Sequence, residues 1–170
     1  MITINPNNGK NIKVGRTTEG TLFELAGAVI IIILWSLTLW FYNNSPELIP
    51  THFDITGKPD GYSDRSSLII LATIGSAIVA GTLCIAYLPQ MISMPVKIRT
   101  ASQYFIAIRL TRITAMQCGI MFILIAIMSG CGKESMTDVC SKLLFAVLMS
   151  IITVIIYYTE KLRRAGKKQD

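Results

Sequence analysis

Four long stretches that are almost free of charge constrain the fold of this chain more than any other feature. They lie at residues 22–42, 68–88, 110–130 and 139–158. Each matches the roughly 20 residues that a helix needs to cross a bilayer. Helices of soluble bundles keep one polar face, and these stretches do not. We therefore predict an all-α integral membrane protein whose residues 21–158 form a four-helix transmembrane bundle.

The first stretch is apolar enough to insert into a membrane on its own. From Leu25 to Tyr42 it carries no charge and holds ten Leu, Ile, Val or Phe residues, which contribute roughly −3 to −6 kcal/mol on the insertion scale. Thr21 and Glu24 fit a capping box, which predicts where the helix begins. No small-residue cleavage pattern follows, so we expect a retained anchor and not a signal peptide.

Basic residues predict the orientation of the chain, because Lys and Arg accumulate in short cytoplasmic segments. Most of the basic residues lie in three of the five segments outside the spans: the N-terminal tail, the loop between the second and third spans, and the C-terminal tail. This distribution predicts a cytoplasmic tail at 1–20, a basic cytoplasmic tail at 159–170 and outer loops at 43–67 and 131–138. The net charge of +6 is then explained by the basic residues of the cytoplasmic segments. We predict no nucleic-acid partner, since no nucleic-acid-binding motif accompanies this charge. The basic residues of the three predicted cytoplasmic segments are Lys10, Lys13, Arg16, Lys97, Arg99, Arg109, Arg112, Lys161, Arg163, Arg164, Lys167 and Lys168.

The segment of residues 95–109 has apolar side chains at helical spacing. Its pattern favours either an interfacial helix against anionic headgroups or an early extension of the third span. A plain connector is the alternative. The spaced residues are Ile98, Ala101, Tyr104, Phe105 and Ile108.

Small residues recur at a spacing of four in two of the spans. Ala72, Ser76 and Ala80 lie in the second, and Ala115 and Gly119 lie in the third. Such stripes let neighbouring helices approach closely. We expect them to pack the bundle, and the first stripe would suit a homo-oligomer equally well.

Two of the four cysteines are predicted at the outer ends of adjacent helices. Cys131 and Cys140 flank the short outer loop, and a disulfide there would join the third and fourth helices. Cys84 and Cys118 fall inside spans and are expected to pack as small apolar residues. Because no metal-ligand spacing occurs among the cysteines, we predict no metal and no cofactor.

The outer loop at 43–67 is too patterned to be a simple tether. Residues 49–54 could form a short strand, Gly57 suits a positive φ, and Pro59-Asp60-Gly61 is a strong turn signal. We predict a small extracytoplasmic cap between the first two helices, built on a pair of strands.

Candidate chemistry in this loop is limited to His52, Asp54, Asp60 and Asp64. These residues either form a metal or acid–base site, or serve structure and recognition. A catalytic zinc site needs three protein ligands, so recognition is favoured and no enzyme is predicted. A transporter or channel is a further alternative, although no ionisable residue lies deep in the four spans.

The loop resembles a bacterial domain-of-unknown-function family, numbered sixteen-forty-eight. That family carries Ile-Pro-x-His-Phe and then Gly-x-Pro-Asp-Gly directly after a first membrane helix. A weaker resemblance, over residues 94–98 with Gln103, Tyr104 and Arg109, is to the cytoplasmic loop of SdpI-like immunity proteins. The residues of the motif are Pro50, His52, Phe53, Asp54, Gly57, Pro59, Asp60 and Gly61.

The resemblance implies a multi-pass protein of the bacterial plasma membrane. For the SdpI-like group it also implies immunity to a secreted toxin or peptide outside and signalling to a cytoplasmic regulator. We therefore expect a non-enzymatic membrane protein, in contact with the lipid bilayer, that recognises its ligand through the outer-loop motif. A small transporter or channel, or a metal-dependent enzyme at the outer face, are the alternatives.

Overall fold

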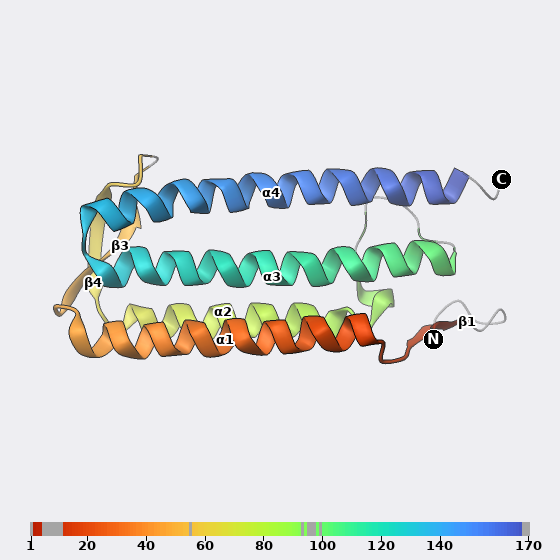
Figure 1. Ribbon diagram of the computed structural model, residues 1–170, viewed down its shortest axis with the longest axis horizontal. Helices are drawn as coiled ribbons and strands as arrows, with labels where there is room; N and C mark the ends of the chain where they lie inside the picture. The colour runs from red at the N-terminus through yellow and green to blue at the C-terminus, as the bar shows by residue number, and fades with distance from the viewer. Residues whose placement is uncertain are drawn as a thin grey trace.

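Each of the four apolar stretches forms one helix in the computed structural model, which describes residues 2–4, 12–54, 56–92, 94, 98 and 100–167. The helices are α1 (Thr18–Asn44), α2 (Ser67–Ile85), α3 (Ala101–Cys131) and α4 (Glu134–Lys167). The four helices run side by side (Figure 1). Within the described part of the chain, these four helices are long and apolar enough to cross a membrane. The predicted four-helix, multi-pass membrane fold is confirmed.

Helix α3 is the centre of the bundle. It packs against α1, α2 and α4, and in Figure 1 it lies between α4 and the α1/α2 pair. Of its most apolar window 44% is buried, against 6% for α4. Helices α1, α2 and α3 therefore form the packed core, and α4 lies along α3 with most of its surface available to lipid.

Close helix approach depends on small residues, as predicted, although the positions differ in α2. A Cβ added at Gly75 would lie 2.8 Å from Cγ of Phe122, and one at Gly119 would lie 2.5 Å from Cγ2 of Ile30. In the predicted α2 stripe, Ala72 is buried but Ala80 is exposed. The buried row of α2 is thus Ala72, Gly75 and Val79, a spacing of three and four.

The predicted start of α1 is wrong by one turn. The N-cap is Thr17, whose Oγ1 accepts a hydrogen bond from the Gly20 amide at 3.0 Å. Glu24, expected in a capping box with Thr21, instead accepts hydrogen bonds from the Tyr87 hydroxyl and from Arg16. A longer-range partner therefore outcompetes the local capping pattern.

Residues 101–109 of the segment before the third span belong to α3 and form no separate interfacial helix. A capping box of Thr100 and Gln103 begins α3 at Ala101. Helix α4 likewise continues to Lys167, through most of the segment expected to be a tail. A short 3-10 helix, η1 (Pro89–Met91), follows α2. Of the basic residues used for the orientation, Lys10, Lys97, Arg99 and Lys168 lie outside the described residues.

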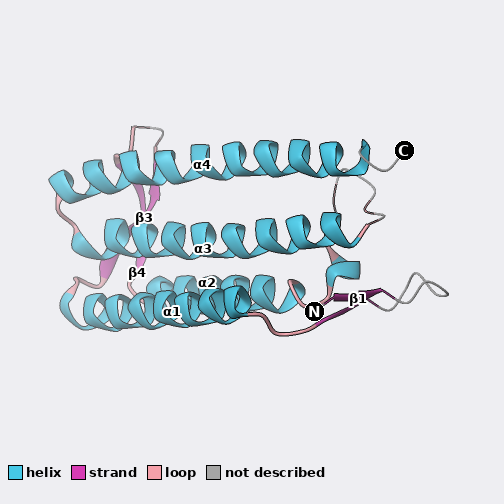
Figure 2. Cartoon of the chain, turned by 45° about the vertical axis from the view of Figure 1, so that its right-hand side comes forward, coloured by secondary structure: helices cyan, strands magenta, loops and turns pink. Residues whose placement is uncertain are grey.

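Two antiparallel hairpins lie at opposite ends of the helices (Figures 1 and 2). Strands β3 (Leu48–Phe53) and β4 (Pro59–Asp64) form the predicted strand pair between α1 and α2. Strands β1 (Ile2–Ile4) and β2 (Ile12–Val14) pair near the termini, and the sequence did not predict them. Both chain termini and the α2–α3 connection lie at the end opposite to the β3–β4 hairpin (Figure 1).

Candidate functional site between the hairpin and helix α4

The β3–β4 hairpin is fixed to the helices by apolar residues of β3. Ile49 is buried with Phe41 and Leu68, at the junction of α1 and α2. Phe53, four positions later, packs against a cluster formed by α3 and α4. Phe53, a predicted recognition residue, is therefore an anchor of the hairpin. The strand ladder is irregular between Pro50 and Phe53, so regular alternation of faces does not place the side chains between Ile49 and Phe53.

Asp54 closes the turn between the two strands. Its Oδ1 accepts hydrogen bonds from the Thr56 hydroxyl at 2.7 Å, the Thr56 amide at 2.8 Å and the Lys58 amide at 2.9 Å. The hydrogen bond from the Thr56 hydroxyl, followed by those from the backbone amides, holds the pKa of Asp54 below its usual value. Gly57 has a φ of +85°, which favours glycine at this point of the turn.

The turn predicted at Pro59-Asp60-Gly61 is wrong, because these residues begin β4. The turn signal of Asp54 with Gly57 prevails, and Pro59 is tolerated since it sits at the first position of a strand. Asp60, expected within that turn, pairs its Oδ1 with Nδ1 of His52 instead. Asp64 precedes α2, where its side chain accepts a hydrogen bond from the Ser66 amide at 2.8 Å.

His52 and Asp60 therefore meet, but on the exposed side of the hairpin. Their side chains are 76% and 48% exposed, and an exposed pair of this kind contributes little stability. Gly61 faces His52 across the strands, and a Cβ there would lie 2.9 Å from Cβ of His52. Gly61 thus leaves room for the histidine.

A groove of about 610 Å³ separates the hairpin from the start of α4. Three predicted motif residues, Pro50, Gly57 and Pro59, line its hairpin side. We call this the cap groove. Its other lining residues are Pro46, Leu48, Thr56, Lys58 and Tyr62 from the hairpin segment, Gly132 at the C-cap of α3, and Glu134, Thr137 and Asp138 from the start of α4.

The cap groove is mainly apolar with a few charges. Prolines, Leu48 and Tyr62 supply the apolar surface. Lys58 is the basic group of the lining, and Glu134 and Asp138 are the acidic ones, the latter bound to Lys142 at 2.7 Å. Apolar walls with a few placed polar groups are typical of ligand sites, and this volume lies within the roughly 300–1,000 Å³ of such sites.

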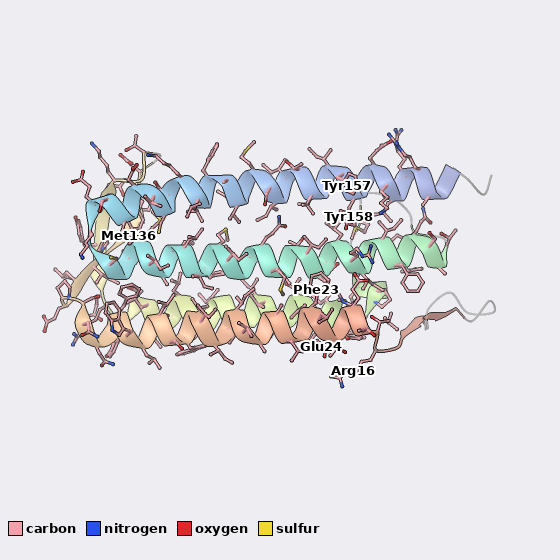
Figure 3. The ribbon with its side chains drawn as sticks, viewed as in Figure 1. Arg16, Phe23, Glu24, Met136, Tyr157 and Tyr158 are labelled. Carbon is pink, nitrogen blue, oxygen red and sulfur yellow. The ribbon has the colours of Figure 1, made fainter. Side chains whose placement is uncertain are left out.

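The α4 side of the cap groove was missed from the sequence. Glu134, Thr137 and Asp138 belong to no motif, and only their place in the second predicted outer loop pointed to this end of the molecule. Met136, labelled in Figure 3, marks the same first turns of α4 beside the hairpin. Packing of α4 on α3 is what brings them opposite the motif.

The histidine and the carboxylates of the outer loop are spread over separate structural positions at this end. Within the described residues, no three His, Cys, Asp or Glu side chains gather in a way that could hold a metal ion. His52 and Asp60 pair outside the cap groove, and Asp54 is committed to its turn. The arrangement offers shape, apolar surface and a few charges to a ligand.

Cys131 and Cys140, the pair considered for a disulfide, are both free cysteines in the structure. Cys131 packs against the cluster of Phe41, Ile49 and Leu68. Cys140 is buried with Leu124 and Met128. The two thiols therefore belong to neighbouring apolar clusters, and Ile127 packs against both.

Comparison with known proteins supports the resemblance read from the outer loop. Residues 29–76 match the model of a domain of unknown function, DUF1648. This range holds most of α1, the whole β3–β4 hairpin and the first half of α2, so the predicted family resemblance is confirmed for this segment. The model ends before residues 94–109, and the SdpI-like resemblance stays a prediction.

A relative of unknown role was also found. An uncharacterized protein of the archaeon Archaeoglobus fulgidus is 36% identical over 87 residues, which cover 46% of this chain and 48% of the relative. The chain thus spans about half the length of the curated relative it matches. No solved structure matches this chain.

Proposed function

We propose that this multi-pass membrane protein is a non-enzymatic recognition protein of the bacterial plasma membrane, with both termini in the cytoplasm and the cap groove outside. One observation carries the proposal. The motif segment, which lies within the region that matches DUF1648, forms one wall of a ligand-sized groove and contributes Pro50, Gly57 and Pro59 to its lining. The distribution of basic residues supports the orientation.

The lining suggests the chemistry of the ligand. Proline, leucine and tyrosine surfaces favour apolar side chains, while Lys58 on one wall and Glu134 on the other favour a ligand with charges of both signs. A short amphipathic peptide meets both requirements. The SdpI-like resemblance extends this proposal to immunity against a secreted peptide toxin and to signalling toward a cytoplasmic regulator.

A cell-survival assay tests the proposed function. In a strain that lacks the chain, wild-type protein should raise survival at least about tenfold against one or more members of a panel of secreted, envelope-active peptides. Lys58→Glu and Tyr62→Ala should lose this protection, because each removes a group that lines the cap groove. Ser63→Ala is the matched control, since Ser63 is an exposed neighbour of Tyr62 on β4 outside the lining.

Membrane levels of every variant are measured by quantitative immunoblot, so that loss of protein is not mistaken for loss of recognition. Equal survival with and without the protein across the panel would contradict the peptide proposal. Full protection by both groove variants would contradict the assignment of the ligand to the cap groove.

A further inference from the structure

A second cavity lies at the opposite end of the molecule, between the beginning of α1, the first half of α3 and the end of α4. It measures about 250 Å³. Three of its lining side chains are basic, Arg109, Arg112 and Lys161, against the single carboxylate of Glu19. The cavity therefore carries an excess of positive charge.

Arg112 is the most unusual group in this lining. Its side chain is buried, with only 4% of the residue exposed, and Nη2 has no hydrogen-bond partner among the described residues. The guanidinium lies 5.4 Å from the centre of the Tyr87 ring and close above Gly20, where a Cβ would come within 2.7 Å of Nη2. A buried charge without a full set of hydrogen bonds is costly, and an anion in the cavity would compensate it.

The carboxylate of Glu19 is engaged directly by Arg109, while the charge of Arg112 acts on Glu19 and Glu24 only at longer range, without a hydrogen bond. Arg109 Nε and Nη2 donate to the two Glu19 oxygens at 2.7 and 2.6 Å. Lys161 also has no carboxylate partner among the described residues. Its Nζ lies 5.8 and 5.7 Å from the ring centres of Tyr157 and Tyr158, while neighbouring Glu160 is held by Arg163 and Arg164.

Most of the remaining lining is apolar, and it lies near the predicted ends of the third and fourth spans. Phe105, Ile106 and Ile108 of α3 line the cavity together with Tyr158 of α4. Figure 3 shows Tyr157 and Tyr158 near the same end of the molecule as Glu24 of α1 and Arg16, which precedes α1. Tyrosines are enriched at the membrane–water interface. The cavity thus joins basic groups to an apolar wall at headgroup depth.

We propose that this cavity binds the phosphate of an anionic phospholipid. Arg112 and Lys161 contact the phosphate, and the acyl chains follow the apolar surface of α3 and α4. Basic pockets between transmembrane helices are suited to anionic headgroups in this way. The site is separate from the cap groove, which lies at the other end of the helices.

Native mass spectrometry of the full chain, released from detergent with added lipid, tests this proposal. Wild-type protein should retain phosphatidylglycerol and not phosphatidylcholine of the same acyl composition. Lys161→Gln should weaken phosphatidylglycerol binding about fivefold, as expected for one basic group near a headgroup, and Arg112→Gln by at least as much. Arg164→Gln is the control, because it removes the same charge from the same end of α4 but lies outside the lining.

Lys161 is exposed, so its substitution tests the site even where Arg112→Gln fails to fold. Equal retention of the two lipids, or equal loss in Lys161→Gln and Arg164→Gln, would overturn the site. A further arm adds inorganic phosphate and glycerol phosphate without lipid. If these soluble anions raise the melting temperature as much as phosphatidylglycerol does, and Lys161→Gln abolishes the effect, the cavity serves a soluble phosphate and the lipid assignment is overturned.

Discussion

Replacing Gly75 by leucine is expected to destabilise the protein by about 3 kcal/mol, near the upper end of the usual cost of overpacking. Gly75 faces both α1 and α3, since a Cβ there would lie 2.8 Å from Cγ of Phe122 and 3.0 Å from Cδ2 of Leu34. A leucine side chain would force the three core helices apart. For a chain of this size the loss corresponds to a fall in melting temperature of roughly 6–12 °C, measured in detergent by scanning fluorimetry.

Gly81→Leu on the same helix is the matched control. No atom lies within 4 Å of a Cβ placed at Gly81. Both substitutions raise helix propensity by a similar amount, so their difference isolates packing against α1 and α3. Equal melting temperatures for the two variants would contradict the arrangement of α2 against α3.

Gly57→Ala is expected to abolish the protection proposed for the cap groove while leaving the helices folded. Alanine at a φ of +85° is strained, at a cost of about 1–2 kcal/mol. Its Cβ would also lie 2.6 Å from Oγ and 2.7 Å from Cβ of Ser141 on α4. The hairpin must then move away from α4, which opens the groove and separates its two walls.

Spin labels at Thr56 and Glu134, on opposite walls of the groove, measure this movement directly. Their mean distance should lengthen in Gly57→Ala and shorten again when Ser141→Gly is added. Gly132→Ala controls for strain alone, because Gly132 has a φ of +62° and nothing within 4 Å of its added Cβ. An unchanged distance in Gly57→Ala would contradict the contact between the hairpin turn and α4.

The membrane architecture could be predicted from the sequence because hydrophobicity acts over whole helices. Each predicted span overlaps one observed helix, and long uncharged runs leave few other folds open. Helix ends were less predictable. Thr17 caps α1 in place of Thr21 since Glu24 is drawn to Tyr87, a residue 63 positions away that no local pattern could indicate.

The candidate site could be predicted only on its hairpin side. The motif indicated the loop whose hairpin forms one wall of the cap groove, but the positions of its side chains depend on strand register. Ile49 and Phe53 pack against the helices, Pro50 lines the cap groove, and His52 pairs with Asp60 on the exposed side, because the strand ladder is irregular between Pro50 and Phe53. No local sequence pattern indicates the α4 wall of the cap groove, because the packing of α4 on α3 brings this wall opposite the hairpin.

The orientation of the cap groove is the central claim, and cysteine labelling in intact cells tests it most directly. In a version with Cys84, Cys118, Cys131 and Cys140 replaced by alanine, a single cysteine is introduced at Thr56 or at Arg164. We expect a membrane-impermeant maleimide to label the Thr56→Cys protein in intact cells, and the Arg164→Cys protein only after the membrane is opened. Labelling of Arg164→Cys but not Thr56→Cys in intact cells would place the cap groove in the cytoplasm and contradict recognition from outside.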